Sequence, residues 1–178
     1  MTCLARVFGV AAATVAAFSA AVSAQEAIFI VRHAERTDQS SDSTLSAEGE
    51  SRAERLARHL RDAGIDAIYS TSFRRTLGTA APLAEALGLD VQTEPTLGPA
   101  PMGSDDRVGR YVEELVTRLG ERHGADRVVV VGHSNTLPAL LAALGHPEPI
   151  SIAGDEYDNL FVVLPQPDSP PTVLRIRF

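Results

Sequence analysis

The sequence predicts a single α/β domain, a three-layer α/β/α sandwich built around a mainly parallel, six-stranded sheet. Apolar runs of strand length alternate with segments of helical periodicity, which is the pattern of α/β domains. The runs at residues 27–31 and 127–131 are almost continuously apolar, as strands buried on both faces are. No repeat or low-complexity linker interrupts the alternation, so residues 25–178 are expected to form one domain.

The first helix is predicted from its periodicity and its end signal. A polar loop rich in Ser and Asp occupies residues 37–44, and a helical pattern follows over residues 46–63. Leu56 and Leu60 lie one helical turn apart on the stripe that would face the sheet. Gly64 ends the pattern, as a glycine after a helix commonly does.

The later elements carry the same signals. A short strand over residues 67–70 leads into a helix over 72–87, which Gly88 closes, and a second short strand follows at 90–93. The Pro- and Gly-rich stretch at 95–103 is expected to be a loop. After this loop the sequence predicts a helix over 105–123, a strand over 127–131, a helix that ends near residue 144, and strands over 160–164 and 173–178.

Charge and composition exclude several classes of function. The net charge is −7, the pI is near 5.2, and all 16 basic residues are Arg, so a nucleic-acid binder with a broad basic face is not expected. Trp is absent, which also argues against a base-stacking platform. Cys3 is the single cysteine, so the chain can form no internal disulfide and has no plausible cysteine nucleophile or cysteine metal site. The chemistry must use His, carboxylate, hydroxyl or Arg groups.

The N-terminal segment resembles an export signal. Arg6 precedes an apolar run over residues 7–22, and the small residues at 22 and 24 match a signal-peptidase site. The alternative is a membrane anchor, but this run is shorter than the roughly 20 residues that cross a bilayer. We expect residues 1–24 to be a signal peptide cleaved after Ala24, and the mature protein to be exported, in the periplasm, without stable membrane insertion.

Two predicted strands end in the same way, and this is the most informative feature of the sequence. His33 follows the first strand directly, and His133 follows the strand at 127–131 after one glycine. If both strands belong to one parallel sheet, both imidazoles emerge at its carboxyl edge, where open α/β sheets bind ligands. Arg32 lies at the same edge, and the second strand delivers Arg74 and Arg75 to it.

Such a cluster is suited to phosphoryl chemistry. An Arg guanidinium is always charged, and its planar fork matches the oxygens of a phosphoryl group. A neutral His can attack phosphorus and divide one difficult displacement into two easier steps. Ser134 and Asn135 begin the following helix, where backbone N–H groups favour an anion. These residues predict a pocket for a small phosphorylated substrate.

Four segments resemble the histidine phosphatase superfamily, which also contains the cofactor-dependent phosphoglycerate mutases. Residues 31–35 (VRHAE) are similar to its Arg-His-Gly/Ala-Glu opening, and residues 45–49 (LSAEG) to its Leu-Thr/Ser-x-x-Gly helix start. Residues 69–76 (YSTSFRRT) resemble its Ser-Ser-x-x-x-Arg-Ala segment, and residues 132–135 (GHSN) its second-histidine motif. The four occur in the family's order, so the resemblance implies a phosphoglycerate mutase-like fold.

The resemblance also implies a role for each matching residue. It makes His33 the nucleophile, Arg32 and Arg75 phosphate ligands, and His133 the fourth member of the pocket. Arg75, rather than its neighbour Arg74, matches the family arginine, which a helical wheel alone could not decide. Arg36 is a candidate for a further substrate contact. The implied enzyme is a metal-independent phosphomonoester hydrolase that needs no cofactor.

The sequence departs from the family at the proton donor. Where many members have Leu-x-Glu, this chain reads Leu-Gly-Pro at residues 97–99. Asp105 is the substitute we consider first, followed by Asp106, Glu94 and Glu35; Asp105 and Asp106 could equally be acids that open a helix, where its dipole favours them.

Two functional hypotheses remain after this comparison. The Gly-x-Trp-Glu stretch typical of the mutases is absent, so the compact phosphatase branch fits best. The missing acid motivates the alternative, a pseudoenzyme that binds phosphorylated ligands without turnover. An exported phosphatase could act on a phosphorylated sugar or on envelope lipopolysaccharide, and the missing acid suggests a good leaving group, such as phosphohistidine. The sequence leaves the substrate and the oligomeric state open.

Overall fold

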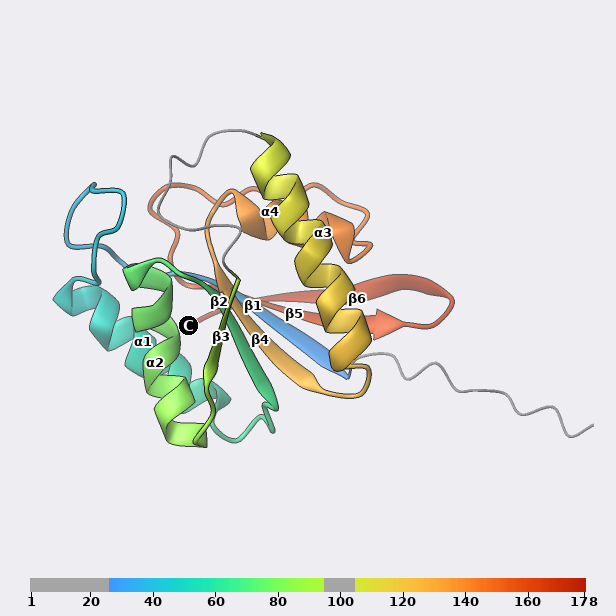
Figure 1. The fold of residues 1–178 in the computed structure, drawn as a ribbon, viewed down its shortest axis with the longest axis horizontal. Helices are drawn as coiled ribbons and strands as arrows, with labels where there is room; N and C mark the ends of the chain where they lie inside the picture. The colour runs from blue at the N-terminus through green and yellow to red at the C-terminus, as the bar shows by residue number, and fades with distance from the viewer. Residues whose placement is uncertain (1–25, 95–104) are drawn as a thin grey trace, which may run out of the picture.

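The computed structural model describes residues 26–94 and 105–178, which form one six-stranded sheet with helices on both faces (Figure 1). The strands are β1 (Ala27–Arg32), β2 (Ala67–Thr71), β3 (Val91–Glu94), β4 (Arg127–Gly132), β5 (Asn159–Gln166) and β6 (Ser169–Arg177). The helices are α1 (Ala47–Leu60), α2 (Arg74–Leu87), α3 (Asp105–Arg122) and α4 (Thr136–Ala143). The strand order in the sheet is β3-β2-β4-β1-β5-β6.

The parallel half of the sheet contains the four strands that alternate with helices. β1 pairs with β4, β4 with β2, and β2 with β3, all in parallel. β1 and β4 lie at the centre of the sheet and are buried along nearly their whole length, which explains their continuous apolar sequences. β5 and β6 form an antiparallel hairpin on the other side of β1. The predicted sheet is therefore confirmed as mostly parallel, with two antiparallel strands at one edge.

Two apolar cores lie between the sheet and the helices, one on each face of the sheet. On one face α1 and α2 pack through Leu56, Leu60 and Leu83 against the sheet, and on the other face α3 and α4 pack through Leu115 and Leu140. Figure 1 shows α1 and α2 on one side of the strands and α3 and α4 on the other. The predicted α/β/α layering is confirmed.

Local signals fix the helix ends near the expected positions. Ser46 caps α1, and its hydroxyl accepts the backbone N–H of Gly49 at 3.2 Å. Gly88 ends α2 in the left-handed conformation, with φ of 66°, as predicted. β6 begins at Ser169, before the expected residue 173, and includes Pro170 and Pro171. An edge strand tolerates these prolines because one side of its backbone pairs with no neighbouring strand.

The N-terminal expectation falls outside the described residues, as does the loop expected at 95–103. The described part of the chain contains no helix that is both long and apolar enough to span a bilayer.

Candidate functional site

The two histidines meet because their strands are neighbours in parallel register. Arg32 of β1 is opposite Gly132 of β4, so the next residue on each strand is a histidine. The backbone N–H of His33 continues the ladder by donating to the carbonyl of Gly132 at 2.9 Å. The two imidazole rings lie edge to face with centroids 5.4 Å apart. The structure thus brings His33 and His133 together at the carboxyl edge of the sheet.

The His33 ring is held in the form that a nucleophile requires. Its Nδ1–H donates to the carbonyl of Ala34 at 2.8 Å, which leaves the lone pair on Nε2. Only 4% of the residue is exposed, and this burial, with the cations Arg75 and Arg32 nearby, lowers the pKa of His33 to about 3. The ring is neutral at neutral pH, so Nε2 is available to attack.

His133 is fixed by contacts at both ring nitrogens. Nη2 of Arg75 lies 3.5 Å from Nδ1 and can only donate, so Nδ1 accepts and the ring hydrogen is on Nε2. Nε2 donates to the hydroxyl of Thr71 at 2.9 Å, and that hydroxyl also contacts the hydroxyl of Thr76 at 2.8 Å. Burial lowers the pKa of His133 well below its ordinary value, and the neighbouring His33 and Arg75 lower it further.

The two adjacent arginines of α2 have opposite environments. Arg75 is 3% exposed and its guanidinium lies over the ring of Phe73, with Cζ 4.2 Å from the ring centroid. Its Nη1 donates to the carbonyl of Ser41 at 2.8 Å. Arg74 is exposed, and its backbone N–H donates to Asp42 at 2.8 Å. Arg75 is therefore the arginine that joins His133 at the site.

Arg32 is buried on the other side of the histidines. Its Nη1 donates to the carbonyls of Ala153 and Glu156, both at 2.9 Å. Its Cζ lies 4.0 Å from the centroid of the Tyr157 ring. The Nε atoms of Arg32 and Arg75 are both buried, and neither has a hydrogen-bond partner among the described residues.

The site concentrates positive charge in a desolvated place. Burial lowers the pKa of both Arg32 and Arg75, and the cation of Arg36 lowers the two values further. Each guanidinium keeps its charge because the ordinary pKa of Arg is so high. Two buried cations with unpartnered donors favour an anion, and a phosphoryl group has both the charge and the number of acceptors to satisfy them.

Glu35 follows His33 closely in the sequence, but its carboxylate is bound by another side chain. Nε of Arg52 donates to its two carboxylate oxygens at 2.8 and 2.9 Å. Although burial acts to raise it, these hydrogen bonds hold the pKa of Glu35 below its usual value. A carboxylate in this environment stays ionised, so Glu35 is a poor proton donor for a leaving group.

The remaining predicted site residues have mixed positions. Arg36 is half-buried, contacts Gln39, and contributes to the positive field at His33. Ser134 is half-buried and Asn135 is exposed at the start of α4. The N–H groups of Thr136 and Leu137 both donate to the carbonyl of His133 at 3.0 Å and so are already satisfied.

An anion at this helix start would therefore have to use the N–H groups of Ser134 or Asn135. Asp105 begins α3, but its side chain is outside the described part of the chain, as are those of Asp106 and Glu94.

Two site residues were not singled out from the sequence. Thr71 is the last residue of β2, and its position at the carboxyl edge was the available signal. Tyr157 lies in the polar segment before β5, and its ring centroid is 5.9 Å from that of His33. No local pattern predicts this contact, because Tyr157 reaches the site through the fold rather than through sequence proximity.

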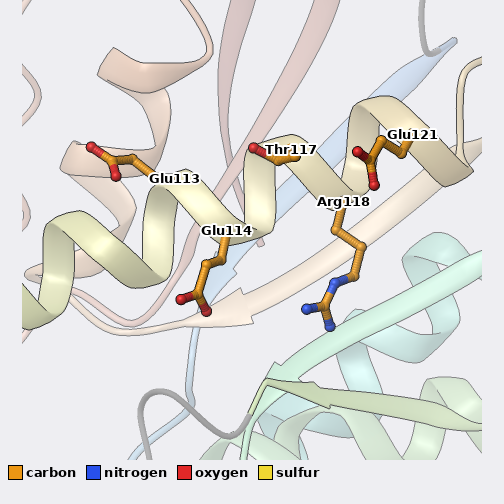
Figure 2. Close-up of a pocket in the computed structure, with 5 residues that line it drawn as sticks. All are labelled: Glu113, Glu114, Thr117, Arg118 and Glu121. Atoms are coloured by element: carbon orange, nitrogen blue, oxygen red, sulfur yellow. The ribbon is translucent and has the colours of Figure 1, made fainter.

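A separate hollow on α3 differs in chemistry from this site. It is lined by side chains of one helix, namely Glu113, Glu114, Thr117, Arg118 and Glu121 (Figure 2). Its three glutamates would repel a phosphate dianion, and we assign it no function. In the described ranges, no three His, Cys, Asp or Glu side chains gather in a way that could hold a metal ion.

Comparisons with known proteins agree with this geometry. The family model described as the histidine phosphatase superfamily (branch 1) matches residues 28–105, which include Arg32, His33 and Arg75. Among curated proteins, the chain is 34% identical over 112 residues to the probable phosphoglycerate mutase GpmB of Enterobacter sp. strain 638. That alignment covers 59% of this chain and 50% of the relative, so the chain spans about half the length of the curated relative.

Solved structures share the fold over a larger part of the chain. A mycobacterial glucosyl-3-phosphoglycerate phosphatase superposes with a TM-score of 0.67 at 18% identity, covering 86% of this chain and 98% of the other. The protein histidine phosphatase SixA, complexed with tungstate, gives 0.66 at 21% identity, covering 85% and 96%. At these identities the superpositions show a common fold. The family model identifies residues 28–105 as histidine phosphatase superfamily sequence, and the curated relative is similar to this chain over 112 residues.

Proposed function

We propose that the protein is a phosphomonoester hydrolase that acts through a covalent phosphohistidine on His33. The observation that carries this proposal is the neutral, buried His33, whose Nε2 lone pair is free, between two buried arginines with unpartnered Nε donors. Arg32, Arg75 and His133 form the phosphate pocket around it. A binding protein would need the cations but would not need a nucleophile held in one tautomer.

The reaction has two steps. In the first, the Nε2 lone pair of His33 forms a bond to phosphorus while the ester P–O bond breaks, and the leaving oxygen takes the bonding electrons. In the second, water attacks the phosphohistidine, the P–N bond breaks, and inorganic phosphate leaves with His33 regenerated. Arg32 and Arg75 neutralise the charge on the equatorial oxygens in both transition states, because their donors are already in place.

The pocket supplies the positive charge that a metal ion would supply in other phosphatases, so we propose that the protein needs no metal or other cofactor. Among the described residues, the carboxylate nearest His33 in sequence is that of Glu35, and it is bound by Arg52. This pairing supports a substrate whose leaving group departs without strong acid assistance. Asp105 remains the first candidate for a donor if one acts. Arg36, Ser134 and Asn135 are proposed as further substrate contacts.

Hydrolysis is favoured over mutase activity. The curated relative is named a probable phosphoglycerate mutase, whereas the two solved structures compared above are named as phosphatases. This chain has no Trp and so lacks the Gly-x-Trp-Glu stretch of the mutases. We also propose that residues 1–24 direct export to the periplasm, where the substrate would be a small phosphorylated compound outside the cytoplasm.

A phosphomonoester panel tests the proposal. Purified residues 25–178 should release inorganic phosphate from an aryl phosphate in the presence of a chelator. Binding of phosphate without release from any activated ester would instead support the pseudoenzyme. Loss of activity on chelation, restored by a divalent ion, would refute the metal-independent mechanism. Conversion of 3-phosphoglycerate to 2-phosphoglycerate, faster than release of phosphate, would establish a mutase.

The leaving-group series gives a second readout. The hydrolysis rate should fall steeply from aryl to alkyl phosphates, because an unprotonated alkoxide leaves poorly. Equal rates across the series, with phosphorylation rate-limiting, would reveal a proton donor, and Asp105→Asn would then be the first variant to measure.

A further inference from the structure

Only some of the guanidinium N–H groups of Arg32 are bound to the protein backbone. Nη1 places hydrogen bonds on two backbone carbonyls of one short segment, those of Ala153 and Glu156. A guanidinium has five N–H groups, and this arrangement leaves Nε and Nη2 for a phosphoryl group. We call residues 153–157 the rim segment. Because its two carbonyls hold Nη1, the rim segment sets the direction in which the other donors of Arg32 point.

Tyr157 completes this support from one face of the guanidinium. Its half-buried ring lies 4.0 Å from Cζ of Arg32, within the range of a cation–π contact. The same ring is tilted by 55° to His33, with centroids 5.9 Å apart. Tyr157 therefore covers both the phosphate-binding arginine and the nucleophile, and helps to keep the face of Arg32 out of water.

The rim segment is itself tied to the edge of the sheet. Oε2 of Glu156 accepts the backbone N–H of Ala153 at 2.7 Å, which closes the segment on itself. Oε1 of Glu156 accepts from Nη2 of Arg177 at 2.7 Å and from Nη2 of Arg175 at 3.2 Å, both on β6. The N–H of Ala153 and the cation of Arg177 hold the pKa of Glu156 below its usual range. The carboxylate thus connects the backbone that holds Arg32 to a strand outside the pocket.

We propose that the rim segment is a positioning device for Arg32, in which Tyr157 and Glu156 are positioning residues and β6 is the anchor. This inference rests on the proposed function, since it takes Arg32 as a ligand of the phosphoryl group. Tyr157 acts through its ring and Glu156 through its carboxylate. Neither needs to touch the substrate to change how tightly phosphate is held.

Phosphate binding tests the proposal directly. The dissociation constant of inorganic phosphate is measured by calorimetry on the purified protein, alongside KM and kcat for an aryl phosphate and the melting temperature. Tyr157→Leu should weaken phosphate binding about 3- to 30-fold, the loss expected for a cation–π contact, and should raise KM in parallel. Tyr157→Phe keeps the ring and should restore binding to within about twofold of wild type. A merely structural role would lower the melting temperature and leave the dissociation constant of the folded protein unchanged.

Glu156→Gln tests the anchor and has a matched control. It removes the charge that Arg175 and Arg177 contact and should weaken phosphate binding about 2- to 5-fold, as for a partly exposed ion pair. Glu54→Gln removes an exposed partner of Arg58 on α1 and should leave the dissociation constant unchanged. Unaltered binding in Tyr157→Leu, or equal loss in Tyr157→Phe, would overturn the inference while leaving the proposed function intact. A wild-type protein that neither binds phosphate nor hydrolyses the ester would refute both.

Discussion

Replacing Arg75 with alanine should remove most of the turnover, whereas the same change at Arg74 should not. Arg75 is buried at the site, with Nη2 beside His133 and an unpartnered Nε, while Arg74 is exposed. Two hydrogen bonds to a charged group are worth about 3–6 kcal/mol together. At about 1.4 kcal/mol per tenfold, kcat/KM should fall about 10²- to 10⁴-fold in Arg75→Ala.

The matched variant isolates the side chain from the local backbone. Arg74→Ala keeps the backbone N–H that donates to Asp42, so the start of α2 should be preserved and kcat/KM should change by less than about threefold. Arg75→Lys keeps a charge but loses the planar fork, and its activity should lie between wild type and Arg75→Ala. Steady-state hydrolysis of an aryl phosphate, with thermal unfolding as a check on folding, measures all three variants.

Unfolding is not the expected cause of the loss. Burial lowers the pKa of Arg75, which means that the folded protein pays a desolvation free energy to keep this charge. Replacing Arg75 with alanine removes that desolvation free energy. A folded Arg75→Ala that retains more activity than Arg74→Ala would refute the assignment of the phosphate ligand.

Three further predictions concern His33 and the contact of helix α1 with the backbone of Glu35. Rapid alkaline quench with labelled substrate should trap phosphate on His33, and His33→Ala should abolish label and turnover; turnover that survives would exclude the covalent step. Burial lowers the pKa of His33 to about 3, so the unfolded chain takes up a proton near pH 6.5 that the folded chain does not. The free energy of unfolding should therefore decrease as pH falls from about 6.5 toward 3, by up to about 1.4 kcal/mol per pH unit. Urea unfolding at several pH values should show that the free energy of unfolding depends less steeply on pH in His33→Gln than in the wild type. An unchanged pH dependence would mean that His33 is not the group responsible. Gly49→Ala would place a methyl group against the carbonyl of Glu35 and should destabilise the protein by about 1–3 kcal/mol. The control Gly120→Ala, in open space on α3, should stabilise it by up to about 1 kcal/mol. Equal effects of the two variants in thermal unfolding would contradict the close approach of Gly49 to Glu35.

Much of the fold was predictable because its signals are local. Continuous apolar runs marked β1 and β4 as central strands, and Gly88 marked the end of α2. The hairpin of β5 and β6 was harder to orient, because pairing direction depends on which strand lies beside β1 and not on the sequence of either strand.

The linear sequence already contains groups suited to phosphoryl chemistry, namely a histidine directly beyond each of two buried strands and arginines at the same edge. The arrangement of these groups depends on how the whole chain folds. Parallel pairing of β1 with β4 joined two histidines 100 residues apart in the sequence, and burial made both neutral. Packing turned Arg75 inward and Arg74 outward, although they are adjacent in the chain. The rim segment reached Arg32 from more than a hundred residues away. The sequence pattern predicted that the two histidines share one edge, but the desolvation of their rings and the contacts of the rim segment depend on the whole folded chain.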